Sequence, residues 1–289
     1  MLTLSLTVLG LVLKPSPDSM LVSTTWLAER LTQPGLVLLQ IGTQSEFTAA
    51  HIPGAQFLNM RDLAAPRGDG PALELPTPEA AEAWLEAHGV SDDSRIVLYW
   101  GSDWVTPTAR MYLTLYWAGL GDRTSILDGG MGAWRAEGRQ VTTDTAVVTP
   151  GRLTLHPRSD VIVTAAEVEG LRTRSDVALI DARDSVFYLG QDTNHVRPGH
   201  IPGARSLPFG SLFDENPDRY KPRDALAGLL RGAGAEAGKQ VVVYCHIGQQ
   251  ASSVWLAAKL LGYDVRLYDG SFTEWTTLQQ YPVEGPARP

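Results

Sequence analysis

Cysteine is almost absent from this sequence: the 289 residues contain one, Cys245, beside six histidines. A single thiol cannot form a disulfide within the chain. With no second cysteine near a pair of histidines, the sequence also has no zinc-type ligand spacing. Cys245 is therefore either a small buried hydrophobe or a reactive group.

Positive charge is also in short supply, since 24 Lys and Arg stand against 32 Asp and Glu, for a net charge of −8. No long basic run is present, and binding to phosphate backbones needs clustered Lys and Arg. Nucleic acid is therefore not expected as the main partner. Small molecules or proteins are the expected partners.

The longest apolar run, residues 2–13, is shorter than the roughly 20 residues that a membrane-spanning helix needs, so no stable membrane association is expected. The run resembles the central part of a secretory signal, but it lacks the positive segment before it and a small-residue cleavage site after it. An alternative is that translation starts at Met20. We expect a cytoplasmic protein, or an exported one if residues 1–19 act as a signal peptide.

What the sequence does contain is enough apolar material for two globular domains. Hydrophobic residues make up 44% of the chain and charged residues 19%. A length of 289 residues exceeds that of a typical single domain.

Three motifs occur twice, in the same order and at nearly constant spacing. The segment "HIPGA" occupies 51–55 and 200–204, "RIVLYW" (95–100) matches "QVVVYC" (240–245), and "LDGGMGAW" (127–134) matches "YDGSFTEW" (268–275). The chain is therefore a duplicated domain. We predict a first domain over 21–142, a linker over 143–163 and a second domain over 164–289.

Each half alternates short β-branched runs with helical patterns. In the second half, "TAAE" at 164–167 has the pattern of a helix capping box, "VALID" and "VVVY" read as buried strands, and apolar residues from Val254 to Leu261 recur at helical spacing before Gly262. The alternation predicts two α/β domains, each a mostly parallel sheet flanked by helices.

Cys245 falls where a predicted strand ends and a helix begins, near Ala251 or Ser252. Ligands of open parallel sheets bind at the carboxyl ends of the strands. The segment "HIGQQ" after the cysteine can turn its backbone N–H groups toward the sulfur, and the helix N-terminus adds a positive dipole end. We expect both to favour the thiolate, which makes a reactive group the better interpretation of Cys245.

These motifs together resemble those of a tandem-domain rhodanese, a sulfurtransferase: "VVVYCHIGQQAS", "DAR" at 181–183, "HIPGA" and "YDGSFTEW" match the active loop and its flanking signatures. The resemblance covers nearly everything after Leu21 and implies two tandem rhodanese-like domains. It implies that Cys245 attacks the outer sulfur of thiosulfate or 3-mercaptopyruvate, becomes a persulfide, and passes the sulfur to cyanide or a thiol. No metal and no organic cofactor is implied. The implied cradle of the sulfur is His246, Ile247, Gly248, Gln249 and Gln250.

The resemblance also implies that the first domain is a non-catalytic copy. Trp100 aligns with Cys245, while Gln40 and Gly42 stand where the second half has "DAR". The first domain is expected to pack against the second, and its loop residues Asp103 or Trp104 could wall the pocket.

Two departures from the family pattern concern the sulfur donor. Thiosulfate-selective members carry basic residues just after the cysteine, where this chain has His246 and Ile247, and a substrate-binding arginine before "YLG" aligns with Phe187. Arg183 is the first candidate to supply positive charge to an anionic donor, ahead of Arg197 and Arg205. Thiosulfate sulfurtransferase is the leading hypothesis and 3-mercaptopyruvate sulfurtransferase the alternative.

Two other classes of function are weaker. A phosphatase or arsenate reductase needs an arginine at the sixth position after the cysteine, where this chain has Ala251. A non-enzymatic persulfide carrier or binding module fits the first domain but not the intact cysteine loop of the second.

Several further residues are interpreted as structural. The segment "IPG" suits a type II turn, so His51 and His200 are expected to be hydrogen-bonded structural residues. Trp134 and Trp275 are expected in the core, and the segment around His195 is expected to be a solvated loop.

Overall fold

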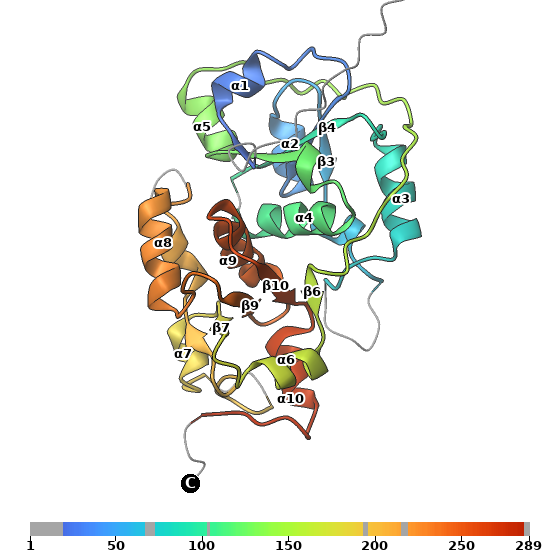
Figure 1. Cartoon of the computed structure of the whole chain (residues 1–289). Helices are drawn as coiled ribbons and strands as arrows, with labels where there is room; N and C mark the ends of the chain where they lie inside the picture. The colour runs from blue at the N-terminus through green and yellow to red at the C-terminus, as the bar shows by residue number, and fades with distance from the viewer. Residues whose placement is uncertain (1–19, 67–72, 103–104, 193–195, 215–218, 286–289) are drawn as a thin grey trace, which may run out of the picture.

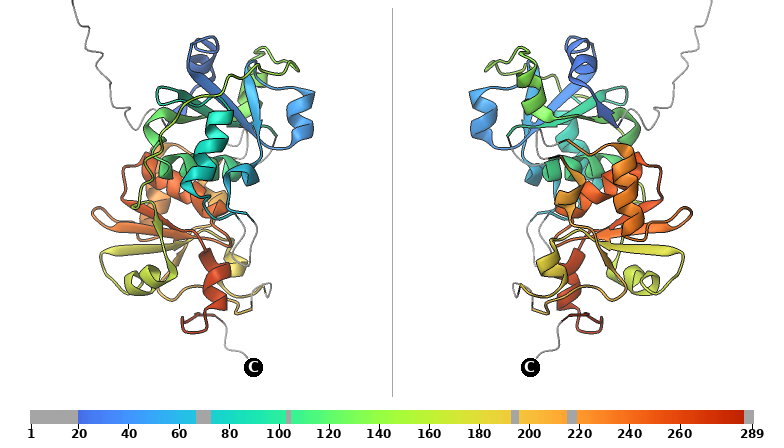
Figure 2. Two further views of the ribbon diagram at one scale, coloured as in Figure 1. Left: turned by 90° about the vertical axis from the view of Figure 1, so that its right-hand side faces the viewer. Right: turned by 90° about the vertical axis from the view of Figure 1, so that its left-hand side faces the viewer.

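The computed structural model describes residues 20–66, 73–102, 105–192, 196–214 and 219–285. They form two domains, one above the other in Figure 1 and seen from two further sides in Figure 2. Each domain holds a five-stranded sheet with all described pairings parallel, in the order β1-β5-β4-β2-β3 and β6-β10-β9-β7-β8. The predicted fold class is confirmed.

The first domain runs from β1 to α5. Its elements are β1 (Leu21–Val22), α1 (Thr24–Ala28), β2 (Leu36–Ile41), α2 (Gln44–Ala49), β3 (Ala55–Leu58), the 3-10 helix η2 (Met60–Leu63), α3 (Pro78–Ala87), β4 (Arg95–Trp100), α4 (Val105–Trp117), η3 (Gly121–Arg123), β5 (Thr124–Leu127) and α5 (Gly130–Ala136).

The second domain repeats this order. Its elements are β6 (Ile162–Val163), α6 (Ala165–Leu171), β7 (Val177–Asp181), α7 (Ser185–Tyr188), β8 (Arg205–Ser206), η4 (Phe209–Leu212), α8 (Arg223–Gly232), β9 (Gln240–Tyr244), α9 (Gln249–Leu260), β10 (Val265–Tyr268) and α10 (Ser271–Thr277). Residues 162–163, which the sequence analysis assigned to the linker, already pair with β10 as the edge strand of the second sheet.

Local sequence signals act as expected at the ends of two helices. Thr164 and Glu167 form the predicted capping box at the start of α6. Gly262 follows α9 with φ 81°, the left-handed conformation that ends many helices. The start of α9 was predicted two residues late, because the helix begins at Gln249 directly after Gly248, whose φ of 84° turns the chain from the loop into the helix.

The repeated "HIPGA" segments are anchored in the same way in both domains. The amides of Ile52 and Ile201 each donate to a tyrosine hydroxyl at 3.1 Å, from the strand that ends beside them. Nδ1 of His51 lies 2.8 Å from the Phe47 carbonyl oxygen, and Nδ1 of His200 lies 2.8 Å from that of Tyr188. Both histidines are hydrogen-bonded structural residues, as predicted.

The two domains share one apolar core, because α4 of the first packs along α9 of the second (Figure 1). The ring of Trp255 on α9 lies 5.0 Å from that of Tyr116 and 6.4 Å from that of Tyr112, both on α4. Helix α4 follows β4, which ends at Trp100, and helix α9 follows the loop that begins at Cys245. The interface therefore lies directly beside the predicted active loop. Trp134 and Trp275 lie in the other two apolar clusters, 1% and 0% exposed, as predicted.

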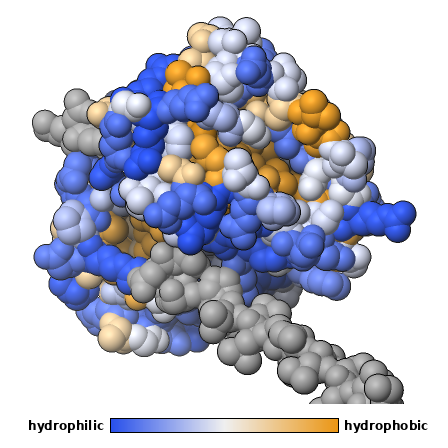
Figure 3. Space-filling view, turned by 90° about the horizontal axis from the view of Figure 1, so that it is seen from above, coloured by the Kyte–Doolittle hydropathy of each residue, from blue (hydrophilic) through white to orange (hydrophobic). Residues whose placement is uncertain are grey.

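The outer surface is mostly polar in the view from above, with smaller apolar areas between the polar side chains (Figure 3). No helix in the described part of the chain is long and apolar enough to cross a membrane. Residues 1–19, for which a signal peptide was considered, lie outside the described residues, as does His195.

Candidate active site

Cys245 is the first residue after β9, at the carboxyl edge of the second sheet, and it is fully buried. Only residues 246–248 lie between Cys245 and the first residue of α9, so the loop that joins the strand to the helix is short. The sequence places its only thiol at the edge where parallel sheets bind ligands.

Four backbone N–H groups surround the Cys245 sulfur. They belong to Ile247, Gly248, Gln250 and Ala251, and each forms a hydrogen bond to the sulfur. The loop and the first turn of α9 thus form a nest of donors, an arrangement that binds anions. Three of the five residues predicted as the cradle, Ile247, Gly248 and Gln250, contribute these donors, together with Ala251. The part of the cradle in binding a donor stays a prediction.

The protonation state of the resting thiol differs from the sequence-based expectation. Burial raises the pKa of the Cys245 thiol, and the four amide hydrogen bonds lower it by less. The expectation overlooked the cost of removing the sulfur from water, which disfavours the charged form. The amides therefore stabilise negative charge most when a charged, extended sulfur group occupies the nest.

The start of α10 braces the loop from the side. The amide of Cys245 donates to the Ser271 hydroxyl at 3.2 Å, and the amides of Phe272 and Thr273 donate to the carbonyl oxygens of Cys245 (3.0 Å) and His246 (3.1 Å). Ser271 has φ 54°, a left-handed conformation that costs a non-glycine residue about 1–2 kcal/mol. The loop therefore has a fixed backbone on both sides of the sulfur.

Arg183, the first candidate to supply positive charge to the donor, lies in a buried ion pair. Its side chain is fully buried, and its guanidinium is bonded to both carboxylate oxygens of Asp181, with Nη2–Oδ2 at 2.5 Å, and to the Gly199 carbonyl oxygen at 2.7 Å. The guanidinium carbon also lies 3.9 Å from the centre of the Phe272 ring. Nη1 of Arg183 is buried without a hydrogen-bond partner among the described residues, and the part of Arg183 in binding a donor stays a prediction.

The other two arginine candidates lie elsewhere. The Arg197 guanidinium donates to four backbone carbonyl oxygens at the end of α10 and beyond, from Trp275 at 2.8 Å to Tyr281 at 2.6 Å. Arg205 is exposed on β8. At the loop itself, the edge of Phe187 meets the ring of His246 with 4.5 Å between ring centres, so an aromatic pair stands where the family pattern has an arginine.

Comparison with known proteins decides the family. The model of the Rhodanese-like domain matches residues 23–137 and again 164–278. The chain belongs to the rhodanese family. Neither matched range tests the exact domain boundaries, which stay a prediction.

Several similar proteins match this chain over most of its length, across both rhodanese-like domains. A Pseudomonas aeruginosa protein, whose name proposes a 3-mercaptopyruvate sulfurtransferase, is 32% identical over 284 residues, covering 92% of this chain and 98% of that one. A Mycobacterium leprae protein, whose name proposes a thiosulfate sulfurtransferase, is 30% identical over 280 residues, with 92% and 98% covered. The crystal structure of SseA from Escherichia coli, described among 3-mercaptopyruvate sulfotransferases, superposes with a TM-score of 0.77 at 28% identity, covering 88% of this chain and 99% of that one.

In the first rhodanese domain, a tryptophan side chain occupies the position of the active-loop cysteine. Trp100, the counterpart of Cys245, is 4% exposed and packs on Gly130, the counterpart of Ser271. Gln40, in place of Asp181, accepts a hydrogen bond from Tyr99 at 2.7 Å. Asp103 and Trp104, expected to wall the pocket, lie outside the described residues.

Sequence reasoning missed the residues of the first domain that do reach the rhodanese loop. Thr106 accepts a hydrogen bond from the Gln249 side chain at 3.2 Å, and Arg110 is buried beside Gly248. The signal was a lone arginine in the otherwise uncharged helical segment "VTPTARMYLTLYW". A buried charge of this kind needs a partner, which the sequence did not identify.

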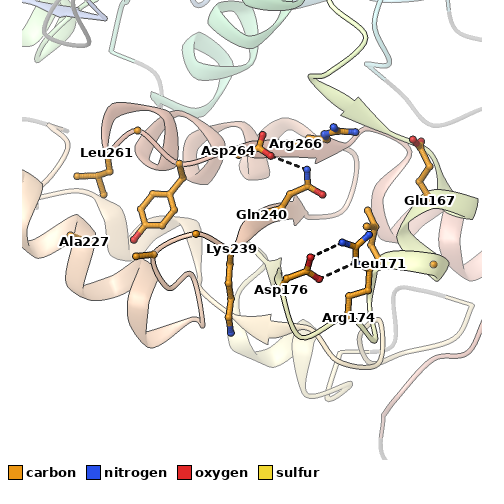
Figure 4. Close-up of a pocket in the computed structure, with 15 residues that line it drawn as sticks. Glu167, Leu171, Arg174, Asp176, Ala227, Lys239, Gln240, Leu261, Asp264 and Arg266 are labelled. Carbon is orange, nitrogen blue, oxygen red and sulfur yellow. Dashed lines mark hydrogen bonds and ion pairs between the residues drawn. The ribbon is translucent and has the colours of Figure 1, made fainter.

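A wide cleft of about 1040 Å³ lies away from this loop (Figure 4). Its lining includes Asp176, just before β7, Gln240, the first residue of β9, and Asp264, just before β10. These mark the amino ends of the strands, and the five residues of β9 put Cys245 about 16 Å further along, at roughly 3.3 Å per residue. The cleft holds paired charges such as Arg174 and Asp176, 2.6 Å apart, and its lining residues include no thiol. We assign the chemistry to the buried loop.

No group of three or more His, Cys, Asp or Glu side chains within the described ranges could hold a metal ion.

Proposed function

We propose that the chain is a sulfurtransferase that moves a sulfane sulfur from thiosulfate to cyanide or another thiophilic acceptor through a persulfide on Cys245. One observation carries the proposal: the only cysteine is buried at the carboxyl end of β9 with four backbone N–H groups bonded to its sulfur. The names of the relatives support the same class of reaction.

The proposed reaction has two balanced steps. The Cys245 thiolate attacks the outer sulfur of thiosulfate, the S–S bond of the donor breaks, and sulfite leaves with the bonding electron pair. The cysteine then carries a persulfide whose terminal sulfur is negative. Cyanide attacks that terminal sulfur, the S–S bond of the persulfide breaks, thiocyanate leaves, and the thiolate returns.

The loop backbone supplies the stabilisation that this sequence needs. Its donors are fixed before the reaction, by α9 on one side and by the start of α10 on the other. Preorganised N–H groups aimed at developing negative charge lower the barrier without reorganising. In a site shielded from water they act more strongly than they would at the surface.

A second donor, 3-mercaptopyruvate, is favoured by the charge around the loop. Arg183 and Arg110, the two arginines whose contacts bring them to this loop, are each paired with a carboxylate. Phe187 stands where the family pattern has a substrate-binding arginine. A dianion such as thiosulfate gains less here than a monocarboxylate thiol. With 3-mercaptopyruvate, the Cys245 thiolate attacks the thiol sulfur, the C–S bond breaks, and the bonding electron pair leaves with the carbon as the enolate of pyruvate. The enolate takes up the thiol proton to give pyruvate, and Cys245 carries the persulfide.

The test is the mass of the intact protein. Treatment with thiosulfate or 3-mercaptopyruvate should add one sulfur atom, and cyanide should remove it. Cys245→Ser should show neither change, and full sulfurtransferase activity in this variant would refute the proposal. Steady-state rates with the two donors, side by side, decide between them, whereas a persulfide that forms without turnover would indicate a carrier.

The cytoplasmic location expected from the sequence is likewise a proposal. Cell fractionation with an antibody against the chain tests it, and recovery outside the cytoplasm would overturn it.

A further inference from the structure

Arg110 is the buried cation that the first domain contributes to the interface. It lies on α4, its side chain is 1% exposed, and its Nη1 donates to Oδ1 of Asp269 in the second domain at 2.5 Å. Its Nη2 donates to the carbonyl oxygen of Leu73 at 2.5 Å. Burying a charged pair carries a large desolvation cost, so the geometry of the pair has to be well defined.

Asp269 connects this arginine to the segment that braces the active loop. Its other oxygen, Oδ2, accepts the backbone N–H of Leu75 from the first domain at 3.0 Å. Asp269 comes two residues before Ser271, whose hydroxyl accepts the Cys245 amide. A carboxylate held from the first domain therefore sets where α10 starts, and α10 sets the backbone on either side of the sulfur.

The same pair touches the loop directly at Gly248. A Cβ atom at this glycine would lie 2.8 Å from Arg110 Nη1 and 2.9 Å from Asp269 Oδ1, so the ion pair is packed against the Gly248 backbone. Gly248 holds φ at 84°, and its N–H is one of the four bonded to the Cys245 sulfur. The position of one donor of the nest therefore depends on an arginine from the other domain.

We propose that Arg110 of the non-catalytic domain is a positioning residue for sulfur transfer: by pairing with Asp269 it holds Gly248 and the start of α10 in the geometry that the persulfide needs. The inference rests on the proposed function. It gives the first domain a role in the reaction, although none of its described residues is proposed to make or break a bond.

Arg110 also balances the negative charge gathered at this point. Burial raises the pKa of Glu74, Asp269 and Glu274 raise it further, and Arg110 lowers it. Without the guanidinium, these carboxylates would act on the loop without an opposing charge from α4. A negative persulfide would then be harder to form.

The duplication provides a matched control. Asp128 is the counterpart of Asp269, and it also meets an arginine of the other domain, with Arg219 Nε 3.9 Å from its Oδ2. Arg219 packs on Gly129, next to the first domain's filled site. Arg219→Met thus removes a cross-domain cation beside the motif "LDGG" and leaves the Cys245 loop untouched.

The experiment compares Arg110→Met, Arg110→Lys and Arg219→Met in the full chain. Two quantities are measured: the single-turnover rate of persulfide formation with the better donor, and the pH dependence of iodoacetamide alkylation of Cys245. We expect Arg110→Met to lower kcat by at least about tenfold with a smaller change in KM, and to move the alkylation profile to higher pH. Arg110→Lys should recover part of the rate, and Arg219→Met should match the wild type.

Three results would overturn the inference. A folded Arg110→Met protein with wild-type kcat and alkylation profile would do so, and so would an equal loss in Arg219→Met. If Arg110→Met does not fold, Asp269→Asn keeps the shape but removes the charge, and wild-type kcat in that variant would be the third. A wild type without turnover on either donor would refute the proposed function instead, while the alkylation profiles would still report on the positioning of Cys245.

Discussion

Trp100 offers a direct test of what the first domain contributes through its filled site. Its side chain is 4% exposed and lies in the core cluster that the two domains share. The ring fills the space above Gly130, where an added Cβ would come within 2.6 Å of its atoms. Trp100→Ala therefore leaves a cavity in the apolar core that the two domains share.

The expected cost can be worked from this burial. Truncating a buried tryptophan to alanine destabilises a protein by roughly 3–5 kcal/mol. Native proteins have about 5–15 kcal/mol of stability in total, so most of the chain should remain folded. At about 2–4 °C per kcal/mol for chains approaching this size, Tm should fall by roughly 6–20 °C.

A double-mutant cycle sharpens the assay. Gly130 has φ 51°, so Gly130→Ala should cost about 1–2 kcal/mol for backbone strain, together with the clash against the Trp100 ring. In the Trp100→Ala background the clash is gone. Denaturant unfolding of the two single variants and the double variant should therefore show a double variant more stable than the sum of the single effects, by at least about 1 kcal/mol.

Activity measured per folded protein then completes the test. The surviving folded fraction of Trp100→Ala should keep the wild-type rate, because the ring touches no reacting group. The reasoning is refuted if folded Trp100→Ala loses persulfide formation while Cys245 still reacts normally with small thiol reagents.

Four further predictions concern the catalytic domain. Gly248→Ala should fold with a much lower rate of persulfide formation, measured by intact mass, because its φ of 84° and the ion pair 2.8–2.9 Å away leave no room for a Cβ. Asp181→Asn should cost about 3–5 kcal/mol in denaturant unfolding because it leaves the buried Arg183 charge without its partner; a loss under 1 kcal/mol would contradict this. Since burial raises the pKa of Cys245, the folded protein should hold its thiol protonated to higher pH than the unfolded chain. Stability from this group should then be full below the unfolded pKa and lost as pH rises through the folded pKa, and an alkylation profile at or below that of a free thiol would contradict it. Ile247→Lys should raise kcat/KM for thiosulfate about tenfold, a factor worth roughly 1.4 kcal/mol, with the gain eroded by salt; no gain at low salt would show that side chain 247 does not face the donor.

The sequence predicted most of the fold because the duplication supplied two readings of each element. The capping box at Thr164 and the position of Cys245 after β9 followed from local patterns that short-range physics decides. The "HIPGA" histidines were predicted to be structural from the turn signature of their own segment, and their Nδ1 atoms contact carbonyl oxygens 4 and 12 residues away. Signals of this kind depend on neighbours within a few residues, which a sequence displays directly.

The partners of buried charges could not be predicted in this way. The ion pair between Arg183 and Asp181 was not predicted, although only one residue separates the two in the sequence. Arg110 drew no attention, since its partner Asp269 lies 159 residues away. The raised pKa of Cys245 was missed because burial depends on the packing of both domains, whereas the amide nest depends only on the local turn.

The two domains differ at the position of the nucleophile and at the residue that faces it. Position 245 is a thiol in one copy and position 100 a tryptophan in the other, and the facing residue changes with it, from Ser271, whose hydroxyl binds the loop, to Gly130, which makes room for the ring. In the first domain, the Trp100 ring packs against Gly130 and fills the site. The equivalent loop of the first domain therefore holds no charged sulfur. At the interface, α4 presents Arg110 and α9 presents the aromatic Trp255. The first copy thus has no thiol at the position of Cys245, and it contacts the loop of the second copy through the Arg110–Asp269 pair.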